Sequence, residues 1–162
     1  MQIDVCCLTE TWLRKGDKSK ISEIKALGYR TFHKSRAGRG GGVAVVYKKD
    51  MNITRVNSKK YGSFEQIQCL IRSSNANDIL RVCCIYRSSS AKSAALQKFF
   101  VDFDDYLDYL THLPGKLIMA GDFNIHVEVK NCTIIHRNFD RSSLTTGLFN
   151  ISMNPHIILG GH

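Results

Sequence analysis

Runs of apolar residues along the chain predict a series of short β-strands. These runs cover residues 3–8, 29–33, 43–47, 64–71, 80–86 and 116–120. Residues 43–47 are continuously apolar, which is typical of a strand buried on both faces, whereas residues 64–71 alternate as in a half-buried strand. The turn-rich residues 73–78 lie between two of these runs and indicate a β-hairpin.

Two other segments show helical spacing. In the stronger one, apolar residues recur every three or four positions and form a wide stripe of Leu96, Phe99, Phe100, Phe103, Leu107 and Leu110. Pro114 and Gly115 close this helix, and Gly28 is the expected end of a shorter helix that begins near Lys18. Four aspartates lie mostly off the stripe and are interpreted as a solvated face rather than a metal site: Asp102, Asp104, Asp105 and Asp108. The pattern predicts a mixed α/β fold.

Length and composition favour one domain that spans residues 1–162. No apolar run approaches the roughly 20 residues needed to cross a membrane, and the first residues lack the features of a signal peptide. We therefore expect a nuclear or cytoplasmic protein that is not secreted. Six cysteines occur without any Cys-x-x-Cys spacing, and four of them form adjacent pairs inside apolar runs, so we expect buried, reduced thiols rather than disulfides or a zinc site.

The net charge of +9 is concentrated near the N-terminus. The first 60 residues contain 14 basic and 5 acidic side chains, and the remaining 102 contain nine of each. Such a basic surface suits a polyanion, nucleic acid or an anionic membrane face, although a lysine-rich solvated surface explains the charge equally well.

Polar side chains follow several of the predicted strands. Glu10, Tyr86, Asp122 and Asn124 each stand at the carboxyl end of an apolar run. In enzymes built on sheets, sites are commonly assembled at that edge. These four residues are therefore the first candidates for a functional site.

Four motifs together resemble a known family. They are Leu8-Thr-Glu-Thr-Trp-Leu13, Arg39-Gly-Gly-Gly-Val-Ala-Val-Val-Tyr-Lys48, Ile85-Tyr-Arg87 and Met119-Ala-Gly-Asp-Phe-Asn-Ile-His-Val127. In order and approximate spacing they resemble the endonuclease domain of LINE-type (non-LTR) retrotransposons. That domain belongs to the endonuclease/exonuclease/phosphatase superfamily and is similar to apurinic/apyrimidinic endonucleases.

The resemblance implies a fold, a reaction and partners. The implied fold is a four-layer α/β sandwich, in which two packed sheets are flanked by helices. The implied reaction is cleavage of a DNA phosphodiester with Mg²⁺, or Mn²⁺ in its place, which produces the nick that primes reverse transcription. DNA is then the partner, with a reverse transcriptase domain downstream in the parent element, and neither a membrane nor a small-molecule cofactor is expected.

The resemblance also assigns roles to the four candidates. Glu10 matches the metal-binding glutamate, and Tyr86 matches a tyrosine whose hydroxyl contacts the scissile phosphate. Asp122 matches the aspartate that orients or deprotonates the attacking water, and Asn124 the amide that holds the phosphate or that water. Each has a structural alternative: Glu10 as a helix cap, Tyr86 as an aromatic with a solvated hydroxyl, and the other two as turn formers.

Four basic residues are candidates for contact with DNA. Lys34, Arg36 and Arg39 stand in a glycine-rich segment and would follow the DNA backbone. Arg87 would contact a phosphate, or would be an exposed arginine that only aids solubility.

The chain also departs from the family pattern. The family's first strand, which carries an asparagine, and its C-terminal Leu-Asp strand and Ser-Asp-His motif have no counterpart here, so we expect an incomplete sandwich without the terminal catalytic histidine. This predicts an endonuclease impaired by truncation, or an incomplete gene model. The alternatives are a catalytically dead nucleic-acid-binding remnant and a phosphoesterase of the same superfamily that acts on lipids or small phosphates.

Overall fold

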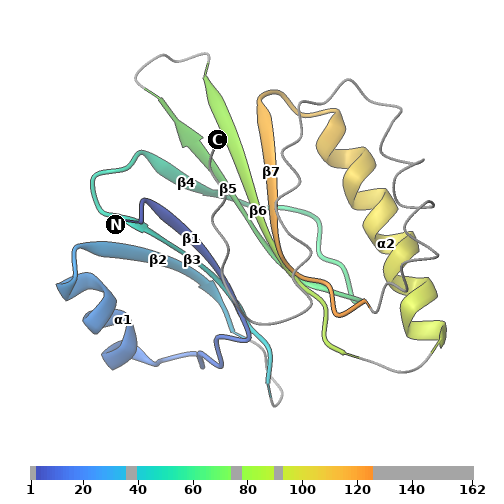
Figure 1. The fold of residues 1–162 in the computed structure, drawn as a ribbon, viewed down its shortest axis with the longest axis horizontal. Helices are drawn as coiled ribbons and strands as arrows, with labels where there is room; N and C mark the ends of the chain where they lie inside the picture. Colours follow the sequence, from blue (N-terminus) through green and yellow to red (C-terminus); the bar gives the residue numbers. More distant parts are fainter. Residues whose placement is uncertain (1–2, 36–39, 74–77, 90–92, 126–162) are drawn as a thin grey trace.

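Two β-sheets pack face to face with helices outside them in the structure, a computed structural model that describes residues 3–35, 40–73, 78–89 and 93–125 (Figure 1). The first sheet has the order β1 (Val5–Thr9), β3 (Val43–Lys48), β2 (Tyr29–Lys34) and is antiparallel. The second has the order β4 (Ile53–Val56), β5 (Glu65–Arg72), β6 (Ile79–Tyr86), β7 (Lys116–Asp122). Helix α1 (Lys18–Ala26) lies beside β2, and α2 (Ser93–Thr111) covers the second sheet (Figure 1). The predicted α/β class of two packed sheets with flanking helices is confirmed.

Within the described residues, one pair of strands is parallel. β5 is antiparallel to both β4 and β6, as the predicted hairpin between β5 and β6 requires, whereas β6 and β7 are parallel and are joined through α2. A parallel pair needs such a crossover connection, and the two strands then end at the same edge of the sheet.

The core has two parts that meet at β6. Between the sheets lie Val43, Val45, Ile67, Cys69, Cys84 and Tyr86. Under α2 lie Phe64, Cys83, Ile85, Phe99, Tyr106, Leu110, Leu117 and Met119. Alternate residues of β6 therefore face the other sheet and the helix, which explains why this strand is a continuous apolar run.

Burial differs from the sequence prediction in several places. β5 is covered on both faces rather than one, since Gln66 and Gln68 are only 5% and 0% exposed. α1 contains no buried residue, and Leu27 directly after it is 76% exposed. Phe100, expected on the buried stripe of α2, is 45% exposed. The short strand β4 was not predicted, because residues 53–56 mix polar and apolar side chains without a clear pattern.

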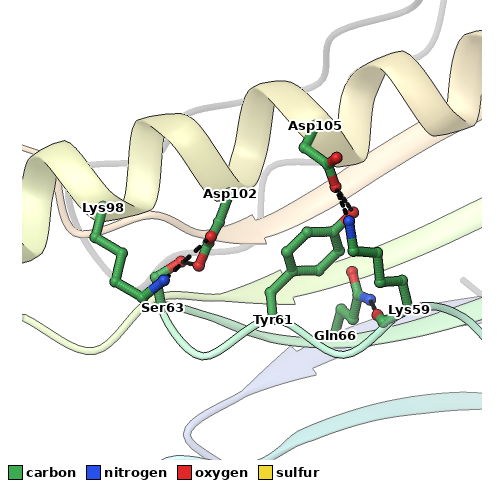
Figure 2. Close-up of polar contacts among 7 residues, drawn as sticks. All are labelled: Lys59, Tyr61, Ser63, Gln66, Lys98, Asp102 and Asp105. Atoms are coloured by element: carbon green, nitrogen blue, oxygen red, sulfur yellow. Dashed lines mark hydrogen bonds and ion pairs between the residues drawn. The ribbon is translucent and has the colours of Figure 1, made fainter.

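The segment 57–64 covers the outer face of β5 and is attached to α2 (Figure 2). Ser63 Oγ donates a hydrogen bond to Asp102 Oδ2 at 2.7 Å, and Tyr61 Oη and Lys59 Nζ bind Asp105 Oδ2 at 2.5 and 2.7 Å. On the sheet side, Gln66 Nε2 donates to Ser58 Oγ at 3.1 Å and to the carbonyl oxygen of residue 59. The expectation of a solvated aspartate face is wrong for Asp102, whose side chain is only 16% exposed, whereas the Asp105 side chain binds this segment and is still 51% exposed.

The cysteines agree with the expectation of free thiols. Cys6, Cys7, Cys69, Cys83 and Cys84 are unpaired in the described part of the chain, and the last three are buried. Burial raises the pKa of the Cys69 thiol to about 12 and that of Cys83 to about 11. Cys132 lies outside the described residues. Within the same residues, no helix has the length and apolar character needed to span a membrane.

We expect Ser63→Ala and Asp102→Asn each to lower the free energy of unfolding by about 1 kcal/mol at pH 7, because the first removes a hydrogen bond to a largely covered carboxylate and the second removes the negative charge that strengthens this bond and pairs with Lys98. The hydrogen bond from Ser63, followed by Lys98, holds the pKa of Asp102 below its ordinary value of 3.8. This stabilisation is present above that value and is lost as the pH falls through the lower folded-state pKa. Urea unfolding at pH 7 and pH 3 should therefore show the gap between wild type and Asp102→Asn closing in acid. Asp104→Asn, which alters an exposed carboxylate of the same helix, is the control; an equal gap at both pH values would contradict the assignment.

Candidate active site

Three strands deliver polar residues to one edge of the molecule. β1, β6 and β7 all end at the lower edge of Figure 1. Tyr86, the last residue of β6, stands opposite Asp122, the last residue of β7, in the parallel register. Glu10 directly follows β1, and the Tyr86 hydroxyl donates a hydrogen bond to Glu10 Oε1 at 2.7 Å. The structure thus brings together side chains from both sheets.

Tyr86 is held as a neutral phenol. Its ring packs between the sheets and the residue is 4% exposed. Burial raises the pKa of Tyr86 well above its ordinary value, and the hydrogen bond to Glu10 and the negative charges of Glu10, Asp122 and Glu65 raise it further. The hydroxyl therefore remains a hydrogen-bond donor at any physiological pH.

Asp122 and Asn124 are joined by a tight turn. Asn124 donates its backbone N–H to Asp122 Oδ1 at 2.9 Å and its Nδ2 to Asp122 Oδ2 at 3.1 Å. Asn124 has a φ of 48°, so the extended strand geometry ends before this residue. The carboxylate aligns them by accepting hydrogen bonds from the residue two positions on, as Asp side chains commonly do in turns.

Gly121 allows the last residues of β7 to approach β6. It has a φ of 150°, and a Cβ atom built on it would lie 1.7 Å from the carbonyl oxygen of Ile85. No other residue fits there without moving the strands. The glycine therefore sets the position of the residue that follows it, Asp122.

Arg87 stabilises the turn at residues 122–124 through several hydrogen bonds. Its backbone N–H donates to the carbonyl oxygen of Asp122 at 2.9 Å, and its carbonyl oxygen accepts from Asn124 Nδ2 at 2.7 Å. Its Nη1 donates to the carbonyl oxygens of Asn124 at 3.1 Å and Phe123 at 3.4 Å, and the guanidinium lies 5.5 Å from the centre of the Phe99 ring. Arg87 is only 4% exposed, so the alternative of an exposed, solubilising arginine is wrong. A phosphate contact by this residue stays a prediction.

A cavity of about 290 Å³ opens beside Tyr86. It is lined by Lys34, Ser35, Tyr61, Gly62, Ser63, Phe64, Glu65, Tyr86 and Ser88. Lys34, a candidate for DNA contact, thus shares a hollow with the candidate tyrosine, and burial lowers the pKa of its amine, although the charge of Glu65 opposes this shift. Arg36 and Arg39 lie outside the described residues.

Backbone strain is concentrated at this edge. In the described part of the chain, the non-glycine residues with a positive φ are Glu10 at 51°, Trp12 at 54° and Asn124 at 48°. Left-handed conformations of residues other than glycine and asparagine are unfavourable and tend to occur at functional sites. The sequence predicted Glu10 and Asn124 as site residues but not Trp12, which was noted only as part of the motif Leu8-Thr-Glu-Thr-Trp-Leu13.

The donor set suits a single hard divalent cation held by few protein ligands. The exposed Glu10 carboxylate uses one oxygen for Tyr86 and has a second oxygen for an ion. The described residues contain no group of three or more His, Cys, Asp and Glu side chains that could hold a metal. Mg²⁺ commonly keeps several waters and takes one or two carboxylates plus phosphate oxygens, so Glu10 fits as its main protein ligand.

The carboxylates of Glu10 and Asp122, the amide of Asn124 and the phenol of Tyr86 thus gather at one edge of two packed sheets. The sequence profile of the Endonuclease/Exonuclease/phosphatase family matches residues 1–131. The chain therefore belongs to the endonuclease/exonuclease/phosphatase family. No curated protein sequence matches it significantly.

Solved structures agree on the fold. The human Nocturnin catalytic domain, with bound sulfate, aligns with a TM-score of 0.59 at 15% identity over 76% of this chain and 52% of its own. A complex of D. rerio TDP2 with a single-strand DNA product gives 0.54 at 17% identity, over 76% and 49%. A 3′ phosphatase, NExo, from Neisseria bound to a product DNA hairpin gives 0.52 at 20% identity, over 80% and 50%. The chain spans about half the length of these structures.

We expect Arg87→Met to lower the free energy of unfolding by about 2 kcal/mol, because the carbonyl oxygens of residues 123 and 124 lose a buried donor. Arg87→Lys should lose less, since an ammonium group still donates to one carbonyl. Urea unfolding measures both, with Arg72→Met as the control because Arg72 is exposed at the end of β5. If Arg87→Met is as stable as the control, Arg87 does not hold the turn.

Proposed function

We propose that this chain is a divalent-metal-dependent DNA endonuclease domain of LINE-type retrotransposon origin. The observation that carries the proposal is the meeting of Glu10, Tyr86 and Asp122 at one edge, where the Tyr86 hydroxyl bonds the Glu10 carboxylate. Each of these side chains belongs to a motif of the sequence that resembles the LINE-type domain, which supports the proposal. Enzymes of this family generally depend on a divalent metal, and Mg²⁺ is the metal we propose here.

The side chains divide the work on a phosphodiester. A cation bound at Glu10 would neutralise charge on the scissile phosphate. The neutral Tyr86 phenol, which donates its one hydrogen to Glu10 Oε1 in the structure, would turn that hydrogen to a phosphate oxygen when substrate is bound, and its raised pKa keeps it protonated. Asp122 accepts a proton from, or orients, the attacking water, while Asn124 positions that water or the phosphate. Asp122 is itself positioned by Gly121 and by the Asn124 turn.

The charge of the chain supports DNA as the substrate rather than a lipid or a small phosphate. Its excess of basic residues lies in the first 60 residues, which include Glu10 and Lys34. A backbone of regularly spaced phosphates gains most from such a surface. TDP2 and NExo, whose folds resemble this one, were solved with DNA bound. Two alternatives, a nucleic-acid-binding remnant without catalysis and a phosphoesterase that acts on small substrates, are distinguished from this proposal by the nicking experiment below.

We expect the purified chain to nick supercoiled plasmid in Mg²⁺ and not in chelator. Glu10→Gln and Asp122→Ala should each abolish nicking while a thermal melt shows that both variants remain folded. Asp104→Asn, which removes an exposed carboxylate of α2, serves as the charge-matched control and should nick normally. DNA binding without nicking would identify a dead remnant, and phosphate release from small esters without nicking would identify the other phosphoesterase class.

We expect Tyr86→Phe to reduce nicking at least about tenfold, because one hydrogen bond to a charged group is lost. The melting temperature should change little, since the ring still fills its place between the sheets. Rates from pH 6 to 9 should show no ionisation that depends on Tyr86, because its raised pKa lies above that range. A wild-type ionisation in this range that disappears in Tyr86→Phe would contradict the role of neutral donor.

A further inference from the structure

Trp12 is the most exposed aromatic side chain among the described residues, with 60% of its surface accessible. It is also the single tryptophan of the sequence and stands two residues after Glu10. One exposed apolar residue alone needs no explanation. The backbone conformation of Trp12, with a φ of 54°, does need an explanation.

The loop that carries Trp12 is clamped by the glycine-rich segment. Thr11 and Trp12 donate their backbone N–H groups to the carbonyl oxygens of Gly42 at 3.2 Å and Gly41 at 3.0 Å. A Cβ atom on Gly42 would lie 2.7 Å from Thr11 Oγ1, so the close approach requires glycine. The edge of the indole passes over Gly40, where a Cβ atom would lie 3.8 Å from the ring. Backbone contacts thus hold a strained residue in place while most of its side chain faces solvent.

We propose that Trp12 is a stacking platform for an unpaired nucleobase next to the phosphate that Glu10 and Tyr86 address. This inference rests on the proposed function and specifies its substrate. Two residues separate the Cα atoms of Glu10 and Trp12 by at most about 7 Å, which is about two base steps of one DNA strand. We infer that an indole carried at this distance reaches the bases that flank the scissile phosphate.

The geometry selects a particular form of DNA. Bases inside a duplex have both faces covered by neighbouring bases, so an indole can stack only on a base that is unpaired, frayed or turned out of the helix. Stacking on an aromatic ring tolerates any base, because each base has a π face. We therefore infer a preference for DNA with a single-stranded or distorted flank, with little preference for sequence from this contact.

The first test uses the fluorescence of Trp12 itself, with chelator present so that no cleavage occurs. A 12-nucleotide oligothymidine should quench the emission of the chain, because the stacked base contacts the indole. An abasic oligonucleotide of equal length and charge should bind without comparable quenching. Absence of quenching at saturating oligothymidine overturns the proposal, whatever the plasmid assay shows.

Variants separate stacking from folding. Trp12→Gly removes the ring at a backbone position that glycine prefers, so it should melt at the wild-type temperature or higher. We expect it to bind labelled oligothymidine about tenfold more weakly, with binding to the abasic strand unchanged. Trp12→Phe should retain most of the affinity, and Phe100→Ala, which removes another exposed aromatic ring on α2, should retain all of it.

Two results would overturn the inference without affecting the proposed nuclease. One is wild-type affinity of Trp12→Gly for oligothymidine, and the other is an equal loss of affinity for the normal and abasic strands. If the chain nicks plasmid while either holds, the function stands and the platform fails. If the chain neither nicks plasmid nor quenches with oligothymidine, both fail.

Discussion

The parallel pairing of β6 with β7 is the constraint on which the rest of the site depends. It makes the two strands end at one edge, and its register sets Tyr86 opposite Asp122. A shift of one residue would move each side chain to the other face of the sheet. Gly121 secures that register, because it fits against the carbonyl of Ile85 where no other residue does. Burial of the apolar runs on both strands stabilises the β6–β7 pairing, but Gly121 fixes its register.

The turn after β7 depends on a second constraint, a buried positive charge. The Arg87 guanidinium faces carbonyl oxygens of residues 123 and 124 and the ring of Phe99, with no carboxylate among these contacts. Burying a charge is unfavourable unless its donors are satisfied. The arginine and the turn therefore stabilise each other: the carbonyls solvate the guanidinium, and the guanidinium keeps Asn124 beside Asp122. The geometry of the proposed active site thus has a structural support from the residue after Tyr86.

The sequence predicted the elements in which the pattern of apolar residues matches the periodicity of a strand or of a helix. β3, β6, β7 and the body of α2 were predicted, because each has an apolar pattern that matches its own geometry. The pattern failed where burial comes from segments distant in sequence. Gln66 looks solvent-facing along its strand, yet residues 58 and 59 cover it and accept its amide hydrogens. The site residues were identified from motifs and strand ends, but their contacts were not, because the Tyr86–Glu10 bond joins two sheets and residues 76 positions apart.

The described non-glycine residues with a positive φ, Glu10, Trp12 and Asn124, differ in what compensates for their backbone conformation. A non-glycine residue in a sparsely populated conformation costs about 1–3 kcal/mol. Asn124 tolerates this conformation as asparagines do and gains local hydrogen bonds to Asp122, whereas at Glu10 the carboxylate gains the Tyr86 hydroxyl. At Trp12 the compensation comes from the backbone, while within the described residues the indole forms no stacked or edge contact with another ring. Glycine would meet the same backbone demands with less strain. A large aromatic side chain that takes a backbone conformation suited to glycine and leaves most of its surface in water is explained, under our proposal, by what it contacts when substrate is bound.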